Sequence, residues 1–480
     1  MGAVESFLSE IVGLGNTIFW DYLLVYLLIF TGIYFTFRTK FIQFKLFPEM
    51  FKVIGEEAVE QSGRRGTNAF QAFSISIASR VGTGNLAGVA LAVAIGGPGA
   101  VFWMWVIALI GMATAFIEST LAQLYKVPDK DGFRGGPAYY IERALGQRWM
   151  AILFSILITI TFGLIFNAVQ ANTITMAVEE AFAIDRVWSG LALVVLAGIV
   201  IFGGIKRIAV VSGTIVPIMA AIYILISLYV VVTNIGEVPG IFMLIIQHAF
   251  GLEQVVGGGI GAALMQGIKR GLFSNEAGMG SAPNAAATAG VSHPAKQGLV
   301  QSLAVFVDTI IICSFTAFTI MLFDNYMDMT EDGIQLTQVA LSSHIGEWAS
   351  IFLAITIFLF AFSSIIGNYY YGESNIAFMN NSVVLKNIFR FVVLGMVMFG
   401  SIASIDIVWN MADLFMAMMA TVNLIAILLL GNIAFALLKD YVKQKKQGVD
   451  PTFKASSLPW LKNVEWWQDD QVIRKDKKDK

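Results

Sequence analysis

Long apolar segments, separated by short polar loops, recur through most of the chain. A helix needs about 20 consecutive apolar residues to cross the roughly 30 Å apolar core of a bilayer. Segments of about this length predict eleven transmembrane helices, and glycine and polar residues interrupt the second and the seventh. The predicted spans are 17–37, 68–95, 99–125, 148–178, 187–204, 208–233, 256–288, 297–323, 348–373, 383–403 and 411–438.

The composition excludes a soluble fold. Of the 480 residues, 57% are hydrophobic and only 13% are charged, and the mean hydropathy is +0.73. A soluble protein of this size could not bury so much apolar surface. We therefore expect an all-α polytopic membrane protein. The single cysteine, Cys313, excludes an internal disulfide, and a net charge of −2 gives no indication of nucleic-acid binding.

Lysine and arginine are concentrated in alternate loops. With eleven spans, 27 of these residues fall on one side, only Arg186 falls on the other, and three lie inside spans. Basic loops are retained in the cytoplasm. The pattern therefore predicts a plasma-membrane protein whose N-terminus is outside and whose C-terminus is cytoplasmic.

Two polar regions lie outside the predicted spans. Residues 41–54 form a basic amphipathic pattern, which fits either a helix in the membrane surface or a linker helix packed on the protein. Residues 441–480 are expected to form a solvated or interfacial tail. The predicted organisation is an extra helix in 1–37, a cytoplasmic segment in 38–67, two five-helix repeats in 68–233 and 234–440, and a cytoplasmic tail in 441–480.

The evidence for a repeat is a shared motif in the two interrupted spans. Arg-x-x-x-x-Asn-x-Ala-Gly runs from Arg80 to Gly88 and again from Arg270 to Gly278, five spans later. Because five is odd, the two units are expected to cross the membrane in opposite directions. This predicts an inverted repeat of five plus five helices with two broken helices, preceded by one extra helix.

Glycines at the interruptions permit a non-helical backbone. Glycine in one span is also explained by close helix packing, but two matching breaks favour a binding function. Unwound backbone exposes N–H and C=O groups that lipid cannot satisfy, so such a break is expected to line a cavity or bind a ligand. Helix N-termini suit a carboxylate, and the freed carbonyl groups suit a small cation.

These segments resemble known transporters. Val81 to Asn85 and Phe273 to Gly280 resemble the unwound first and sixth helices of the leucine-transporter fold. Ser79 to Ala90, Gly135 to Ile141 and Ser274 to Pro283 are similar to the alanine/glycine:cation symporter family, the amino acid carrier proteins. The similarity extends to about residue 440.

The resemblance implies sodium-coupled symport of a small neutral amino acid, alanine or glycine, by alternating access. It implies neither an enzyme nor a cofactor beyond the coupling ion Na+. Glutamine or serine as the substrate, and protons as the coupling ion, stay open. From another class, a channel or an intramembrane enzyme is the alternative, although His-Glu-x-x-His and Gly-x-Ser-x-Gly motifs are missing.

The resemblance also implies a substrate site. The substrate carboxylate would meet Thr83, Gly84 and Asn85, and its amine would lie near Phe273, Ser274 and Asn275, with Gly278 in the second break. Phe166, Asn167 and Gln170 are one helical turn apart on the fourth span and are candidates for selectivity. Gln170 could instead form a structural hydrogen bond between helices.

A sodium site is implied by Phe360-Ala361-Phe362-Ser363-Ser364 in the ninth span. The resemblance assigns as ligands the hydroxyl groups of Ser363 and Ser364 and the carbonyl groups of Phe360, Ala78 and Val81. A second cation site would use Asn85, Ser274 and Asp308.

Seven charged residues lie inside apolar spans, where insertion costs about 2.5–3.5 kcal/mol for each Arg, Lys or Asp at the centre. We expect them to form structural ion pairs or gate bridges, with Arg80 or Arg270 pairing with Glu118, Glu276 or Glu373. The seven are Arg80, Glu118, Lys269, Arg270, Glu276, Asp308 and Glu373.

Overall fold

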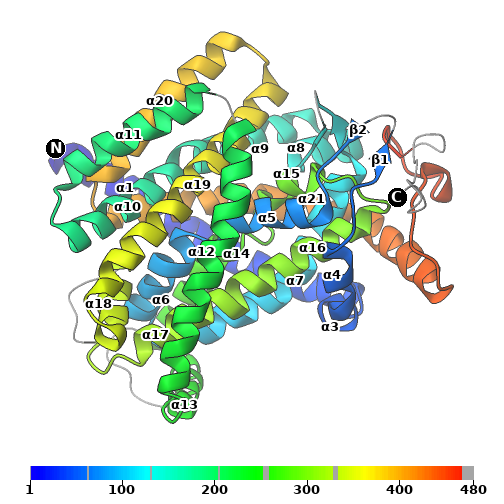
Figure 1. Ribbon diagram of the computed structural model, residues 1–480. Helices are drawn as coiled ribbons and strands as arrows, with labels where there is room; N and C mark the ends of the chain where they lie inside the picture. The colour runs from blue at the N-terminus through cyan, green and yellow to red at the C-terminus, as the bar shows by residue number, and fades with distance from the viewer. Residues whose placement is uncertain are drawn as a thin grey trace, which may run out of the picture.

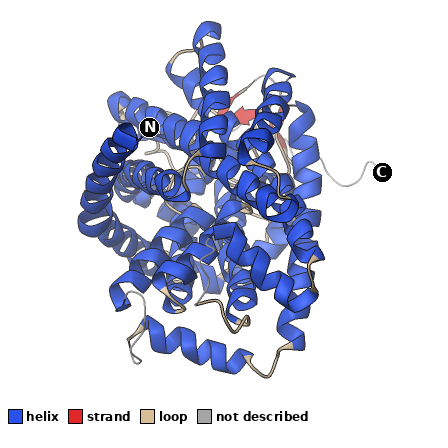
Figure 2. Ribbon diagram, turned by 90° about the vertical axis from the view of Figure 1, so that its left-hand side faces the viewer, coloured by secondary structure: helices blue, strands red, loops and turns tan. Residues whose placement is uncertain are grey.

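Helices form nearly all of the regular structure (Figures 1 and 2). The computed structural model describes residues 2–61, 64–129, 132–203, 206–251, 259–327 and 333–467. In these ranges eight helices are long and apolar enough to cross a membrane, and two bent helix pairs raise the number to as many as ten. The prediction of an all-α polytopic protein is confirmed, whereas the count of eleven stays a prediction.

Several of the long helices consist of consecutive helical pieces, in which η marks a π-helical stretch. The long helices are α1 (Gly2–Asn16), η1 (Thr17–Leu24) and α2 (Val25–Arg38); α5 (Ala69–Arg80), η2 (Gly84–Gly88) and α6 (Val89–Gly96); α7 (Gly99–Leu124); α9 (Arg148–Ile160), η4 (Thr161–Phe166) and α10 (Asn167–Phe182); α11 (Arg186–Gly203); α12 (Lys206–Thr233); α14 (Gly259–Asn275) and α15 (Ala282–Ala287); α16 (Pro294–Val305), η5 (Phe306–Cys313) and α17 (Ser314–Met321); α19 (Trp348–Met379); α20 (Val383–Ile402); and α21 (Ile405–Lys446).

Shorter elements connect these helices. They are α3 (Ile42–Lys45), α4 (Phe47–Ile54), α8 (Pro137–Tyr140), the π-helical turn η3 (Ile141–Leu145), α13 (Val238–Ala249), α18 (Gly333–Ile345) and the 3-10 turn η6 (Ala455–Ser457). Two antiparallel hairpins pair β1 (Glu60–Gln61) with β2 (Arg64–Arg65) and β3 (Val127–Pro128) with β4 (Phe133–Arg134).

Both broken helices contact α7: α6 of the first and α14 and α15 of the second pack on it. The helix α16 packs on α7 as well. Glycine makes the contact of α14 with α7 close. A Cβ atom added to Gly267 would lie 2.4 Å from the carbonyl oxygen of Ala100, and one added to Gly271 would lie 2.5 Å from a methyl group of Ile107. Small residues at such positions let two membrane helices approach backbone to backbone. This packing fixes the position of the segment that precedes the second break.

The segment 41–54 has two different faces. Met50 and Val53 of α4 are buried, and Phe47 stacks edge-on against Phe306 with ring centres 4.9 Å apart. Phe44 and Phe51 are more than half exposed. One face therefore packs on the protein, as a linker helix would, and the other carries exposed aromatic side chains, as a helix in the membrane surface would.

Most described residues of the tail from residue 441 are exposed, as predicted for a solvated or interfacial tail, but a few aromatic side chains anchor it on the bundle. Phe453 and Trp467 are fully buried. The Phe453 N–H donates to the carbonyl group of Ser292 (2.8 Å), and the Trp467 indole donates to that of Gln123 (3.1 Å). The apolar side chains of this basic tail find a complementary surface at the end of the bundle. Residues 468–480 lie outside the described part.

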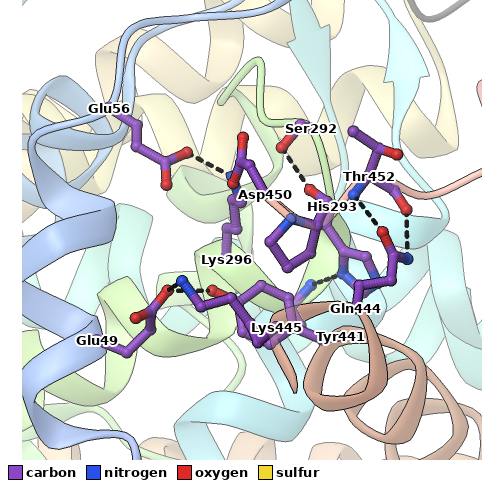
Figure 3. A network of polar contacts seen from close by, with 12 residues as sticks. Glu49, Glu56, Ser292, His293, Lys296, Tyr441, Gln444, Lys445, Asp450 and Thr452 are labelled. Carbon is purple, nitrogen blue, oxygen red and sulfur yellow. Dashed lines mark hydrogen bonds and ion pairs between the residues drawn. The ribbon is translucent and has the colours of Figure 1, made fainter. Parts of the chain in front are cut away.

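An ion-pair network around a buried lysine joins this tail to the bundle (Figure 3). Lys296, at the start of α16, has no exposed side-chain surface, and its ammonium group lies 2.6 Å from both Glu56 and Asp450. In α21, Tyr441 donates a hydrogen bond to Glu49 (2.9 Å). The segment before α5, the start of α16 and the chain after α21 are therefore held together by one set of charges.

Candidate functional site

The first break separates α5 from η2 and α6 and bends the helix by 52°, which confirms the predicted interruption. The backbone leaves the helix at Val81, where ψ is 109°, and the Gly82 N–H donates to the side-chain oxygen of Asn85 (3.0 Å). Thr83 and Gly84 begin the next helical stretch. N–H groups in the first turn of a helix have no intrahelical acceptor. The break therefore presents free donors and a positive dipole end, which suit a carboxylate.

The second break separates α14 from α15. Gly278 and Gly280 have φ values of +86° and +89°, a left-handed backbone that favours glycine. The Gly278 N–H donates to Glu118 (3.0 Å), and its carbonyl group accepts from Asn423 (2.9 Å). Protein side chains thus satisfy the freed backbone groups here. Among the described residues, no hydrogen bond joins Gly278 to Thr83, so these two predicted site residues have separate surroundings.

Gln170 reaches the first break from α10. The Thr83 hydroxyl donates a 2.6 Å hydrogen bond to the Gln170 side-chain oxygen. A Cβ atom on Gly82 would lie 3.3 Å from the Ser364 hydroxyl and 3.6 Å from the Gln170 oxygen. The Gln170 side chain therefore joins two helices and also lies at the edge of the break. This contact fits both the structural and the pocket interpretation of Gln170. Asn167, by contrast, donates to the Gly163 carbonyl group of its own helix (2.9 Å).

An aromatic column stands beside the break. The ring centres of Phe166 and Phe273 are 4.7 Å apart, and the ring centre of Trp409 in α21 is also 4.7 Å from that of Phe273. A Cβ atom on Gly84 would lie only 3.1 Å from the Phe273 ring. The space next to the free amides is thus bounded by bulky rings. Phe166 and Phe273 come together as predicted, whereas the sequence analysis did not identify Trp409.

The predicted sodium ligands converge where α19 meets the end of α5. The Ser364 hydroxyl lies 3.3 Å from the carbonyl oxygen of Ala78 and 3.1 Å from that of Phe360. The Ser363 hydroxyl lies 2.7 Å from the same Phe360 oxygen. Val81, the fifth predicted ligand, is the residue at which α5 ends. Hydroxyl and carbonyl oxygens from two helices are hard ligands of the kind that alkali and alkaline-earth cations prefer.

The residues of the predicted second cation site also come together. Asn85 donates to one carboxylate oxygen of Asp308 (2.8 Å), and the Ser274 hydroxyl donates to the other (2.7 Å). All three residues are buried, and Cys313 lies beside them, 3.2 Å from the Ser274 hydroxyl. Asn275 forms a different contact from this cluster: its side-chain oxygen accepts a hydrogen bond from the Ala277 N–H (3.0 Å) in the second break.

The predicted partners of Arg270 are wrong. Arg270 pairs with Asp413 of α21 through two hydrogen bonds of 2.8 and 2.6 Å, and its guanidinium group lies 4.6 Å from the ring centre of Trp409. Lys269 is 3.4 Å from the same carboxylate group. Sequence analysis missed Asp413, although a lone aspartate inside the apolar span 411–438 is itself costly enough to indicate a buried partner.

The other intramembrane charges have partners that were not predicted. Glu276 accepts hydrogen bonds from the hydroxyl groups of Ser79 (3.1 Å) and Ser281 (2.5 Å), and Glu373 lies 3.4 Å from Arg390. Arg80 is buried, and within the described residues its guanidinium nitrogens have no hydrogen-bond partner. The expected Arg80 ion pairs are therefore absent from this part of the chain.

The broken helix, the helix-start amides and the oxygen cluster define a membrane transporter that binds small solutes inside a helix bundle. The sequence profile of the sodium:alanine symporter family matches residues 5–455, and the chain belongs to this family. This confirms the resemblance inferred from the motifs, and it confirms that the protein is a transporter and not an enzyme.

Two relatives and one solved structure give the degree of similarity. The chain is 58% identical over 468 residues to amino-acid carrier protein AlsT of Bacillus subtilis (strain 168), covering 98% of this chain and 99% of the relative. It is 53% identical over 464 residues to the probable sodium/glutamine symporter GlnT of the same strain, covering 97% of each. The crystal structure of MhsT in complex with L-phenylalanine has a TM-score of 0.52 at 15% identity, covering 80% of this chain and 99% of that one, which supports the leucine-transporter-like fold alone.

Proposed function

We propose that the protein carries alanine or glycine into the cell together with sodium by alternating access. One observation supports this most strongly: in the first break, a Cβ atom on Gly82 would approach the Ser364 hydroxyl, and one on Gly84 would approach the Phe273 ring of the aromatic column. An amino acid and a cation would therefore bind on the two sides of the same unwound segment. Membership of the sodium:alanine symporter family agrees with this arrangement.

The substrate carboxylate would accept hydrogen bonds from the amides of Thr83, Gly84 and Asn85, because these N–H groups start a helix. The substrate amine would lie near Phe273, Ser274 and Asn275, at the end of α14. Every α-amino acid shares these two groups, so selectivity must arise from the walls. Phe273, which contacts Phe166, lies directly beside Gly84 and would restrict the site to a small side chain.

Sodium would bind to the hydroxyl groups of Ser363 and Ser364 and to the carbonyl groups of Phe360, Ala78 and Val81. Its ligands come from α19 and from the end of α5, so a bound ion would hold these two helices together. The Ser364 hydroxyl lies close to Gly82, next to the substrate amides, so ion and substrate would stabilise the same conformation of the break. Asn85, Ser274 and Asp308 would form a second, weaker cation site.

The transport path would have its outer closure at Arg270, Asp413 and Trp409. We infer eleven spans, with α14 and α15 together forming the seventh, an outside N-terminus and a cytoplasmic C-terminus. The two five-helix units would then be inverted repeats. In this topology α21 enters the membrane from outside near Asp413. The ion pair and the indole would cover the aromatic column from that side, and opening would require them to part.

Glutamine is the second candidate, and the relative GlnT at 53% identity is the observation that favours it. In that case Gln170 and Asn167 would be the amide partners. Uptake of radiolabelled alanine, glycine, serine, glutamine and leucine into proteoliposomes distinguishes the two. Our proposal predicts that unlabelled alanine or glycine competes best for sodium-driven uptake. Strongest competition by glutamine would replace the small-substrate proposal while leaving the fold and the break intact.

A further inference from the structure

A basic cavity lies where α2 and α21 end side by side. The two helices are in contact near their ends, where the rings of Phe35 and Phe435 are 6.0 Å apart. The cavity has a volume of about 740 Å³ and is bounded by the end of α2, by α3 and by the last turns of α21. Its lining contains no carboxylate among the described residues and six cationic side chains: Arg38, Lys40, Lys45, Lys439, Lys443 and Lys446.

The end of α21 divides into two faces. Residues 439, 442, 443 and 446 follow helical spacing and line the cavity. The opposite face carries Asp440, Tyr441 and Lys445, which are engaged in the ion-pair network (Figure 3). The carboxylates near this opposite face already have partners. Asp440 accepts a hydrogen bond from Gln444 (2.7 Å), and Glu49 forms an ion pair with Lys445 (2.7 Å). The ion pairs of this network therefore engage none of the six cavity cations, although Asp440 offsets part of the charge of Lys443.

Arg38 is held in place at the cavity. One of its N–H groups donates to the side-chain oxygen of Asn432 (3.2 Å), and its guanidinium group lies 4.8 Å from the ring centre of Phe435. Arginine has five N–H donors in a planar fork that matches the oxygens of a phosphate group. A guanidinium group fixed in this way loses little conformational freedom when it binds an anion.

The rest of the lining is apolar. Ile42, Leu46, Phe435, Leu438 and Val442 contribute hydrocarbon surface to the same cavity. The apolar spans predicted from the sequence end at residues 37 and 438, directly beside it. Phe41 and Phe44, which flank this region, are 41% and 59% exposed. The cavity therefore combines an apolar wall and a cationic rim at the edge of the membrane-crossing segments.

We propose that this cavity binds an anionic phospholipid, with the phosphate at Arg38 and the lysine ammonium groups and the acyl chains along the apolar wall. Basic pockets between helix ends at the membrane surface are suited to anionic lipid head groups. A small soluble phosphate would leave the apolar wall unused. A zwitterionic lipid brings its own cation to a cavity that already contains six cationic side chains.

The test uses the purified full-length protein in detergent and native mass spectrometry. Phosphatidylglycerol and phosphatidylcholine with identical acyl chains are offered together, and the retained lipid is counted. The cavity variant Lys439→Gln/Lys443→Gln/Lys446→Gln is compared with Lys52→Gln/Lys454→Gln/Lys462→Gln, which loses the same charge from exposed positions outside the cavity. The single variant Arg38→Gln removes the placed guanidinium group with a smaller change in charge. sn-Glycerol 3-phosphate serves as a soluble phosphate competitor.

Wild type should retain phosphatidylglycerol over phosphatidylcholine by about tenfold or more, given about 1 kcal/mol for each basic residue near an anionic lipid surface. The cavity variant and Arg38→Gln should lose most of this preference, and the exposed-lysine variant should keep it. Equal loss in the exposed-lysine variant, an unchanged preference in both cavity variants, or displacement of the lipid by sn-glycerol 3-phosphate would overturn the proposal. Unchanged circular dichroism spectra show that the variants are folded.

Discussion

One terminal guanidinium nitrogen of Arg270 in α14 donates to both carboxylate oxygens of Asp413 in α21, at 2.8 and 2.6 Å, and the guanidinium group lies 4.6 Å from the ring centre of Trp409. Trp409 in turn stacks on Phe273, which reaches the first break. A charge pair inside the membrane is thus connected by direct ring contacts to the unwound segment. If this ion pair is the outer closure proposed above, these contacts would connect it to substrate bound at the break.

Asp413→Asn should strongly reduce both stability and uptake. Removing one partner of a buried pair leaves a buried charge, at a cost of about 3–5 kcal/mol. The melting temperature in detergent and the initial rate of sodium-driven alanine uptake measure the effect. Asp406→Asn, at an exposed position at the start of α21, is the matched control. The double variant Arg270→Gln/Asp413→Asn should recover part of the stability, because it leaves no unpaired arginine. A single variant as stable as the control would contradict a buried ion pair.

Ser364→Ala should raise the sodium concentration that gives half-maximal uptake, and Ser363→Ala/Ser364→Ala should raise it further. Each change removes one of five proposed oxygen ligands. The maximal rate at saturating sodium should fall less than the apparent sodium affinity. Ser343→Ala serves as the control, since the Ser343 hydroxyl bonds only to the Ala340 carbonyl group within α18 among the described residues. An unchanged sodium dependence in a folded double variant would remove this site.

Gly84→Ala should weaken alanine binding. The added Cβ would lie 3.1 Å from both the Phe273 ring and the Ser274 Cα, so it must take space beside the amides of the break. Gly367→Ala in α19 is the comparison, since a Cβ there meets no atom within 4 Å. Binding is measured by competition against radiolabelled alanine. Equal apparent affinities for the two variants would show that the substrate does not occupy the space next to Gly84.

Phe273→Ala should relax selectivity before it abolishes alanine transport. The ring contacts both Phe166 and Trp409, so truncation opens a space beside the break. One methylene of pocket space changes discrimination by about 10–200-fold. Leucine should gain most in competition with alanine. Phe391→Ala, at an exposed position on α20, should leave the ranking of amino acids as it is in wild type. If a folded Phe273→Ala variant lost affinity for alanine and leucine alike, Phe273 would not be a wall of the substrate site that excludes large side chains.

His293 should make stability sensitive to acid. It lies just before the membrane-crossing segment Pro294–Met321, it is fully buried, and its Nδ1 accepts the Ala295 N–H (3.1 Å). Burial lowers the pKa of His293 and outweighs the Asp440 carboxylate, which would raise it. The folded protein therefore keeps the ring neutral, whereas the unfolded chain takes up a proton below about pH 6.5. The stabilisation is complete above that pH and is lost as the pH falls.

The variant His293→Asn keeps a capping oxygen but does not titrate. Its melting temperature should decline less than that of wild type between about pH 7.5 and about pH 5.5. Parallel melting curves for the two proteins over this range would contradict a neutral buried histidine.

The features that sequence reasoning found are local or belong to a family pattern. Glycine and polar residues inside apolar spans predicted both breaks, because the same interruption recurs in two corresponding spans. The serine pair of α19 was placed by resemblance. The contacts that were not predicted join residues far apart in the sequence. Asp413 is 143 residues from Arg270, and Glu118 is 160 residues from Gly278. No local period encodes such partners. The burial of Phe453 and Trp467 in the tail was not predicted either, because it depends on surfaces elsewhere in the chain.

The most direct test of sodium-coupled amino-acid symport is the uptake of radiolabelled alanine into proteoliposomes that contain the purified protein. An inward sodium gradient is compared with a potassium gradient and with an inward proton gradient at the same membrane potential. We predict saturable uptake that concentrates alanine only under the sodium gradient and that collapses when an ionophore dissipates the gradient. Equal accumulation under the proton gradient, or equilibration that never exceeds the external alanine concentration, would contradict sodium-coupled symport.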